Sequence, residues 1–156
     1  DSCLVGSEMC IRDRYKVIDA KKTYEVRHPV LRKNLPLSSC YMELDDEVST
    51  IHLGGFIKKK MVAVLSILIN PKYSNYQTPN AQVRGMAVLN KYQSKGIGIN
   101  MFTEAEKKIN KHRINLIWLN ARIDAVDFYK KCGFSIIGKK FRLEYGGEHF
   151  KMIKKL

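Results

Sequence analysis

A short segment in the second half of the chain combines a strand, two glycines and the start of a helix. Residues 81–89 are predicted to form a strand, and Gln93-Ser94-Lys95-Gly96-Ile97-Gly98 follows them. The backbone N–H groups at a helix N-terminus lack intrahelical partners and bind anions, and glycine lets the backbone approach a phosphate closely. We therefore expect residues 93–98 to hold the phosphate of a ligand.

This segment does not match the common nucleotide-binding loops. A Walker loop needs Gly-Lys-Ser/Thr, whereas Ile99 and Asn100 follow the second glycine here. A dinucleotide loop needs three glycines, and only Gly96 and Gly98 are present. Taken alone, the two glycines also suit a tight strand-to-helix turn with no ligand, and that alternative stays open at this point.

The elements that position the segment follow from apolar periodicity. A helix after Gly98 is predicted because Ile97, Met101, Phe102, Ala105 and Ile109 share one face. The other predicted strands are residues 15–18, 39–44, 50–57, 61–69, 115–119, 134–138, 140–143 and 149–153, and the other predicted helices are residues 23–32, interrupted by Pro29, and residues 124–132, with Asp124 as N-cap and Gly133 beyond the last turn. Strands followed by alternating strands and helices indicate one mixed α/β (α+β) domain.

The composition excludes several classes of protein. Of the 156 residues, 45% are apolar and 28% are charged, as in a globular domain and unlike a disordered chain. The longest apolar run, residues 61–69, is far shorter than a membrane-spanning helix of roughly 20 residues, so no membrane partner is expected. The four cysteines have neither metal-ligand spacing nor the density of a disulfide framework. We expect a cytoplasmic protein without a metal.

The formal net charge is +13, which attracts polyanions. Nucleic acid is nevertheless disfavoured, because the sequence contains no zinc finger, helix-turn-helix or RNP-type strand and its lysines lie in every segment. We interpret the charge as a solvated basic surface, part of which attracts an anionic cofactor such as a CoA phosphate.

The N-terminal residues 1–14 differ from the rest of the chain. Met9-Cys10-Ile11-Arg12-Asp13-Arg14 resembles the translation of a transposon sequencing adapter. We interpret residues 1–14 as a non-native extension and residues 15–156 as the domain, with a genuine extension as the alternative.

The order of motifs resembles that of the GNAT superfamily of N-acetyltransferases, in particular a small single-domain bacterial branch. Residues 93–98 are similar to the family's [Gln/Arg]-x-x-Gly-x-[Gly/Ala] pyrophosphate loop, and Phe128-Tyr129-Lys130-Lys131-Cys132-Gly133-Phe134 to its Phe-Tyr-x-x-x-Gly-Phe motif. Met86-Ala87-Val88, Asn120-Ala121-Arg122 and His149-Phe150-Lys151-Met152 also look like family strands. One departure concerns the proton acceptor, because Gln82 and Arg84 stand on the strand where the family often has a glutamate.

The resemblance implies a twisted, mixed, mostly antiparallel sheet flanked by helices, and transfer of an acetyl group from acetyl-CoA to a primary amine by direct attack. The acceptor could be a small amine, an amino sugar or a peptide N-terminus. The implied acetyl-CoA-binding residues are Met86, Ala87, Val88, Gln93, Ser94, Lys95, Gly96, Ile97, Gly98 and Asn120. The resemblance implies Tyr129 as general acid, while Glu144 and His149 are candidates to contact the acceptor.

Two functions of other classes stay open on the sequence. A non-catalytic acyl-CoA-binding domain would bind CoA without turnover of any amine. A basic nucleic-acid-binding module would show strongly salt-dependent binding. A homodimer is compatible with the sequence.

Overall fold

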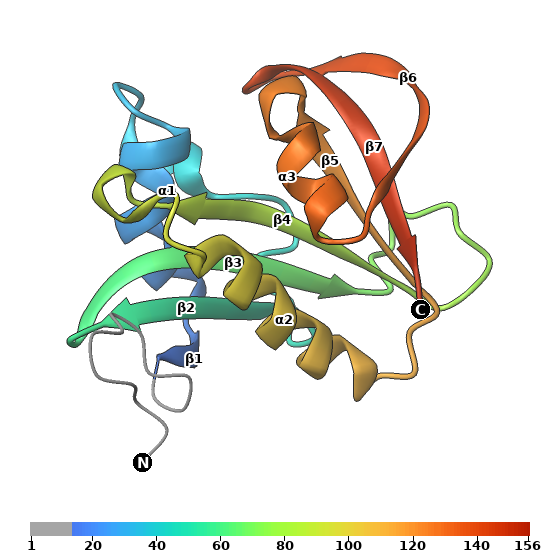
Figure 1. Cartoon of the computed structure of the whole chain (residues 1–156), viewed down its shortest axis with the longest axis horizontal. Helices are drawn as coiled ribbons and strands as arrows, with labels where there is room; N and C mark the ends of the chain where they lie inside the picture. Colours follow the sequence, from blue (N-terminus) through green and yellow to red (C-terminus); the bar gives the residue numbers. More distant parts are fainter. Residues whose placement is uncertain (1–13) are drawn as a thin grey trace.

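A computed structural model describes residues 14–156, which form a seven-stranded sheet with helices on both faces (Figure 1). The strand order is β1-β2-β3-β4-β5-β7-β6, and every neighbouring pair is antiparallel except β4 and β5. The strands are β1 (Tyr15–Ile18), β2 (Ile51–Ile57), β3 (Lys60–Ile69), β4 (Asn80–Val88), β5 (Leu116–Arg122), β6 (Ser135–Leu143) and β7 (Gly147–Lys155). The helices are α1 (Tyr24–Leu31), α2 (Ile97–Asn110) and α3 (Val126–Lys131), with short 3-10 turns η1 (Ala20–Thr23), η2 (Leu37–Cys40), η3 (Asn90–Tyr92) and η4 (Ile123–Ala125). The mixed, mostly antiparallel sheet expected from the sequence is confirmed.

Alternate residues of β3 serve the two faces of the sheet. Ala63, Leu65 and Ile67 belong to the larger apolar core, which includes α2, while Val64 packs in a second cluster with Val26 of α1. This alternation follows from the two-residue repeat of a strand. The five apolar residues predicted for one face of α2 are all buried, so the periodicity identified both the helix and its inner face.

Strands β4 and β5 separate over most of their length. Their parallel pairing covers only Asn80–Gln82 of β4 and Leu116–Trp118 of β5, although β4 continues to Val88 and β5 to Arg122. A bulge places Gly85 and Met86 of β4 opposite one residue of β3, and Gly85 has a φ of +63°. Bulges bend a strand and increase its twist. The two strands consequently diverge toward their carboxyl ends, as Figure 1 shows.

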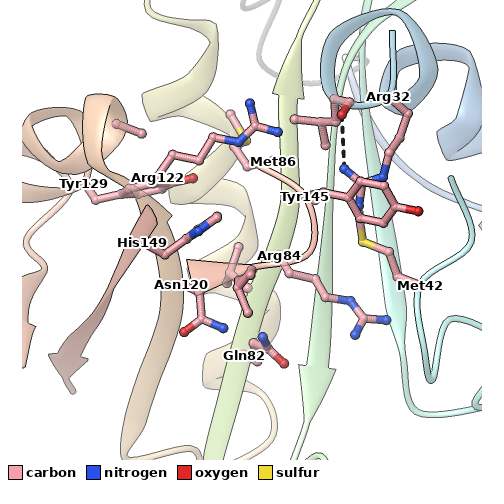
Figure 2. Close-up of a pocket in the computed structure, with 15 residues that line it drawn as sticks. Arg32, Met42, Gln82, Arg84, Met86, Asn120, Arg122, Tyr129, Tyr145 and His149 are labelled. Carbon is pink, nitrogen blue, oxygen red and sulfur yellow. Dashed lines mark hydrogen bonds between the residues drawn. The ribbon is translucent and has the colours of Figure 1, made fainter. Parts of the chain in front are cut away.

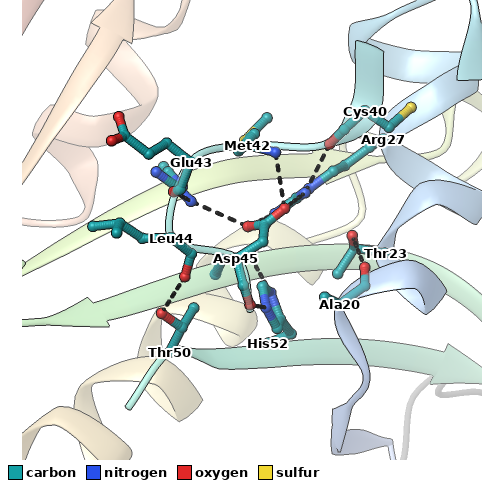
Figure 3. Close-up of polar contacts among 12 residues, drawn as sticks. Ala20, Thr23, Arg27, Cys40, Met42, Glu43, Leu44, Asp45, Thr50 and His52 are labelled. Carbon is teal, nitrogen blue, oxygen red and sulfur yellow. Dashed lines mark hydrogen bonds and ion pairs between the residues drawn. The ribbon is translucent and has the colours of Figure 1, made fainter. Parts of the chain in front are cut away.

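A buried ion pair holds the segment between α1 and β2 (Figure 3). Arg27 of α1, fully buried, donates to both carboxylate oxygens of Asp45 at 2.6 and 3.1 Å, and to Ser66 Oγ of β3 at 2.9 Å. The same carboxylate accepts from the backbone N–H of Met42 at 3.0 Å. His52 is buried beside it, with its ring nitrogens 2.6 Å from Ser66 Oγ and 2.8 Å from the Asp45 carbonyl oxygen. This network ties α1, the loop and the sheet together.

The strand predicted for residues 39–44 is wrong. The segment instead contains η2 and a series of turns, in which Leu44 has a φ of +72°. Its backbone groups bond within local turns and to side chains rather than to a neighbouring strand. The Cys40 carbonyl, for example, accepts from Arg27 at 2.9 Å. Without a strand partner, an apolar pattern over six residues does not produce a strand.

Other element boundaries differ in smaller ways. Strand β5 extends beyond the predicted residues 115–119, and residues 134–138 and 140–143 form one strand, β6, with an irregular register after Ile137. The helix predicted for residues 124–132 is shorter, and Asp124 lies in η4, where it does not cap α3. Gly133 has a φ of +97°, as expected beyond a helix end. No helix within residues 14–156 is long and apolar enough to cross a membrane.

Candidate active site

The predicted phosphate loop lies at the N-terminus of α2. Ser94 and Gly96 adopt positive φ values of +63° and +81°, and Gly96 is the N-cap residue. The first bond that closes a turn of α2 runs from the Asn100 N–H to the Gly96 carbonyl oxygen at 3.1 Å. The N–H groups of Ile97, Gly98 and Ile99 therefore have no acceptor inside the helix, and no side chain caps them. Such N–H groups, together with the helix dipole, favour a negatively charged group at this position.

The two glycines of this loop have different physical roles. A Cβ on Gly96 would meet nothing within 4 Å, so the left-handed conformation is what favours glycine there. A Cβ on Gly98 would lie 2.9 Å from Phe128 Cζ and 3.2 Å from Met86 Cε. Gly98 thus allows α2 to pack closely against α3 and β4. Sequence reasoning assigned both glycines to the ligand and missed this packing role.

Gln93 closes the loop onto the end of β4. Its side-chain Nε2 donates to the Val88 carbonyl oxygen at 2.9 Å and to Asn90 Oδ1 at 3.1 Å. Ala87 and Val88 pair with β3 on one side, and no strand within residues 14–156 pairs with the other side of this stretch of β4. The backbone edge of residues 86–88 therefore faces the opening between β4 and β5.

A cavity of about 270 Å³ occupies the opening between the two strands (Figure 2). Four of the predicted site residues line it, namely Met86, Asn120, Tyr129 and His149. They come from β4, β5, α3 and β7. The cavity also reaches Arg32 and Met42 on the α1 side of the sheet. Glu144 does not line it, and lies exposed after the end of β6.

Tyr129 packs in a cluster of aromatic rings. Its ring meets Phe102, Phe128 and Phe134 edge-on, with centroids 5.6, 5.2 and 6.2 Å away. Burial, with a smaller contribution from the Cys132 thiol, raises the pKa of Tyr129 well above its usual value. The hydroxyl is therefore protonated at neutral pH, as a proton donor must be.

Asn120 and His149 present hydrogen-bond acceptors at the cavity. Asn120 Oδ1 is buried and has no hydrogen-bond partner within residues 14–156. His149 Nδ1 lies 2.8 Å from the Gly147 carbonyl oxygen, which can only accept. In the neutral form of the ring, the proton therefore resides on Nδ1 and the lone pair on Nε2. Figure 2 shows both side chains between Tyr129 and Gln82.

Three arginines at the cavity were not predicted as site residues. Arg32, Arg84 and Arg122 line it, and none of the described lining residues is Asp or Glu. They come from the end of α1, from β4 and from β5, so no motif in the sequence connects them. The net charge of +13 does not locate a site, and the sequence motifs that contain Arg84 and Arg122 did not assign either side chain to the cavity.

The described residues offer no evident metal site. Within residues 14–156, no three His, Cys, Asp or Glu side chains are grouped so that they could hold a metal ion. Cys132 is half-buried, and burial raises the pKa of its thiol. That environment disfavours the reactive thiolate.

The separated strands, the loop at the start of α2 and the cavity between them are the site of an acyltransferase domain. Residues 55–156 match the acetyltransferase (GNAT) domain family, and the chain belongs to that family.

Several known proteins resemble the chain. YitI of Bacillus subtilis strain 168, an uncharacterized N-acetyltransferase, is 28% identical over 141 residues, which make up 90% of this chain and 95% of YitI. The crystal structure of Escherichia coli ElaA has a TM-score of 0.69 at 16% identity and covers 90% of this chain and 98% of its own. An aminoglycoside 6'-N-acetyltransferase complexed with coenzyme A has a TM-score of 0.71 at 13% identity, with coverages of 90% and 96%. At these identities the two structures show the shared fold.

Proposed function

We propose that the protein transfers the acetyl group of acetyl-CoA to a primary amine of a small acceptor, by direct attack while both substrates are bound. One observation carries the proposal. The cavity in the β4–β5 opening contains Tyr129 and Asn120, and the same opening adjoins the unpaired N–H groups at the start of α2. A donor bound by its phosphates at the loop can therefore extend along β4 into the cavity.

The residues present fit CoA in two ways. The N–H groups of residues 97–99 suit the negative pyrophosphate, and Gly96 leaves open space on their outer side. The backbone edge of residues 86–88 offers the amide-bonded pantetheine arm hydrogen-bond partners like those of a neighbouring strand. Acetyl-CoA supplies an acyl group that is already activated as a thioester, so this chain mainly positions the reactants.

We assign Tyr129 as the donor of the proton that the sulfur of the leaving group needs. Attack by the amine nitrogen forms a C–N bond and breaks the C–S bond, and the sulfur then needs one proton. The Tyr129 hydroxyl lies at the cavity and is protonated at neutral pH. It supplies that proton and recovers one from solvent, while the nitrogen releases one, so the reaction is balanced overall.

His149 is assigned the proton acceptor. An amine is mostly protonated at pH 7, and the neutral form is the nucleophile. The arginines that line the cavity disfavour another positive charge, which favours the neutral amine. His149 Nε2 carries a lone pair at the cavity and can take the proton that the nitrogen releases.

A thiol-release assay tests the proposal. Acetyl-CoA affinity is measured first by calorimetry, and free thiol is then followed while the chain is incubated with acetyl-CoA and a panel of amines. Thiol release that depends on one class of amine, with formation of the N-acetyl product, is the expected result. Tight acetyl-CoA binding without thiol release from any amine would contradict the proposal and indicate a non-catalytic binding domain.

A further inference from the structure

Two arginines at the cavity have no compensating negative charge. Arg84 forms an ion pair, because its Nη2 lies 3.1 Å from Asp45 Oδ1, although it shares this carboxylate with Arg27. Arg32 and Arg122 form no ion pair with any Asp or Glu in the described part of the chain. Two positive charges therefore face one small cavity without a counterion.

Arg32 is held rigidly at the α1 side of the cavity. The residue is only 8% exposed, and its guanidinium lies 4.0 Å from the centre of the Tyr145 ring. Its Nε donates to the Ser39 carbonyl oxygen at 3.0 Å, and its Nη1 to the Leu31 carbonyl oxygen at 3.1 Å, the bond drawn in Figure 2. Its Nη2 has no hydrogen-bond partner within residues 14–156, so these donors remain for a ligand.

Arg122 approaches the same cavity from the end of β5. Its side chain passes Gly146 in the turn between β6 and β7, where a Cβ would lie 2.6 Å from Arg122 Nε and 3.2 Å from His149 Cε1. Gly146 has a φ of +84°, so a glycine suits both the backbone and the space. The turn thereby holds Arg122 next to His149 and brings Tyr145 over Arg32. Figure 2 shows the Arg122 side chain across the cavity from Arg32.

This arrangement is unfavourable until an anion binds. Burial, together with the positive charge of Arg122, lowers the pKa of Arg32, while Tyr145 opposes this effect. Like charges in a partly dehydrated site repel each other more strongly than they would in water. An anion between them relieves the repulsion and uses the free donors. A polycation, such as an aminoglycoside or a polyamine, increases the repulsion instead.

We infer that the acceptor is a small primary amine that carries a carboxylate, of the amino-acid type, and that Arg32 and Arg122 bind this carboxylate. The planar fork of a guanidinium matches a carboxylate in two hydrogen bonds. The cavity of about 270 Å³ has room for an acceptor of amino-acid size, and a second hollow that shares Gln82 and Asn120 adjoins it. Asn120 Oδ1 is the available acceptor for the amine N–H. The inference rests on the proposed function and narrows it to one substrate class.

Matched acceptor pairs test the inference in the thiol-release assay with acetyl-CoA and the full chain. Each of several amino acids is compared with its C-terminal amide, which removes the negative charge and keeps the shape and the amine. Phosphoethanolamine compared with ethanolamine tests a phosphate in place of the carboxylate. We expect kcat/KM to be at least about tenfold higher for the acid than for its amide. Equal values for acid and amide, or a preference confined to the phosphate pair, would overturn the inference.

Two variants test the assigned residues. Arg122→Gln is expected to lower kcat/KM for the acid at least about tenfold more than it lowers kcat/KM for the amide, and to leave acetyl-CoA affinity unchanged. Arg32→Gln is expected to have the same effect on kcat/KM. If this variant does not fold, Arg122→Gln and the preference of the wild type for the acid still test the inference. Arg142→Gln is the control, since Arg142 is an exposed arginine of β6 that does not line the cavity. If Arg122→Gln weakens acetyl-CoA binding and keeps the preference for the acid, the arginine serves the cofactor and the inference fails.

A binding measurement separates failure of the inference from failure of the proposed function. Calorimetry compares an N-acetyl amino acid with its amide, each added to the chain saturated with CoA, and requires no turnover. Tighter binding of the acid supports the carboxylate site, whereas equal binding overturns it. Absence of thiol release with every amine would refute the proposed function, independently of this comparison.

Discussion

Replacing Gly96 by aspartate or asparagine tests the CoA site through charge alone. A side chain at this position meets no atom within 4 Å, so neither residue causes a clash. The φ of +81° strains most L-residues, but Asn and Asp tolerate the left-handed region better than other non-glycine residues and have nearly the same shape. The strain is therefore common to both variants, and the difference between them isolates one negative charge beside the N-terminus of α2.

The magnitude follows from Coulomb's law. A carboxylate about 5 Å from a bound phosphate is repelled by about 0.8 kcal/mol at the dielectric constant of water and by about 3 kcal/mol at an effective dielectric of 20. We expect Gly96→Asp to bind acetyl-CoA about tenfold to a hundredfold more weakly than Gly96→Asn, which itself remains within about tenfold of the wild type. The gap between the variants shrinks at high salt, because exposed charges are screened.

Isothermal titration calorimetry with acetyl-CoA at low and high salt measures this gap. Circular dichroism and thermal unfolding confirm first that both variants fold. If two folded variants bind acetyl-CoA equally at low salt, the phosphates do not lie at residues 94–99. In that case residues 93–98 form a tight strand-to-helix turn with no ligand, the alternative that the sequence left open.

Three further predictions concern single side chains. Tyr129→Phe keeps the buried ring, so acetyl-CoA affinity should stay within a few-fold while kcat falls about 10²-fold. If kcat is unchanged although the chemical step limits the rate, Tyr129 has no part in the mechanism. His149→Gln replaces the ring by an amide that forms hydrogen bonds but cannot take a proton, so kcat should fall with little change in acetyl-CoA affinity. A pH–rate profile like that of the wild type in this variant would exclude His149 as the proton acceptor. Burial alone would raise the pKa of Asp45, but the bonds to Arg27 and Met42 and the charge of Arg84 outweigh it, so the pKa is lowered. The ionised Asp45 therefore stabilises the fold. This stabilisation is complete above about pH 4 and is lost as pH falls through the folded-state pKa. Asp45→Asn should cost about 3–5 kcal/mol in urea unfolding at pH 7 and reduce this acid dependence, and equal stability of both proteins at pH 7 would show that the ion pair contributes nothing.

The spacing of apolar residues was sufficient to predict an element whose own residues form its buried face. The apolar positions of α2 recur every three or four residues, and all five predicted ones are buried. It failed for residues 39–44, because the conformation there depends on Asp45 and on its partner Arg27, which lies 18 residues away in the chain. A pattern of apolar residues contains no information about such a partner.

The candidate site was predicted in its contiguous loop and, through the family resemblance, at four cavity residues from separate elements, but not at its arginines. Residues 93–98 form the loop at the start of α2 as expected, because their chemistry depends on local backbone geometry. The arginines of the cavity come from three elements that meet only after folding, and their residue type is common throughout this basic chain. Glu144 was proposed because it lies near a turn in the sequence, but the turn directs Tyr145 toward the cavity and leaves Glu144 exposed. The interpretation of residues 1–14 concerns mainly residues 1–13, which lie outside the described part of the chain. Arg14 is described, and its carbonyl accepts from the Phe56 N–H at 2.7 Å.

The missing glutamate on β4 and the positive cavity have a common physical explanation. Gln82 Oε1 accepts a hydrogen bond from the Tyr73 hydroxyl, and Arg84 is committed to Asp45, so neither of the β4 residues at this position provides a base. Because Arg84 takes the place of a carboxylate on this strand, the cavity lining contains arginines without an acidic side chain. Adjacent guanidinium groups would lower the pKa of a carboxylate at this position and make it a weak base. An acceptor that brings its own carboxylate would balance the charge of Arg32 and Arg122, leaving the amine beside His149 and Asn120.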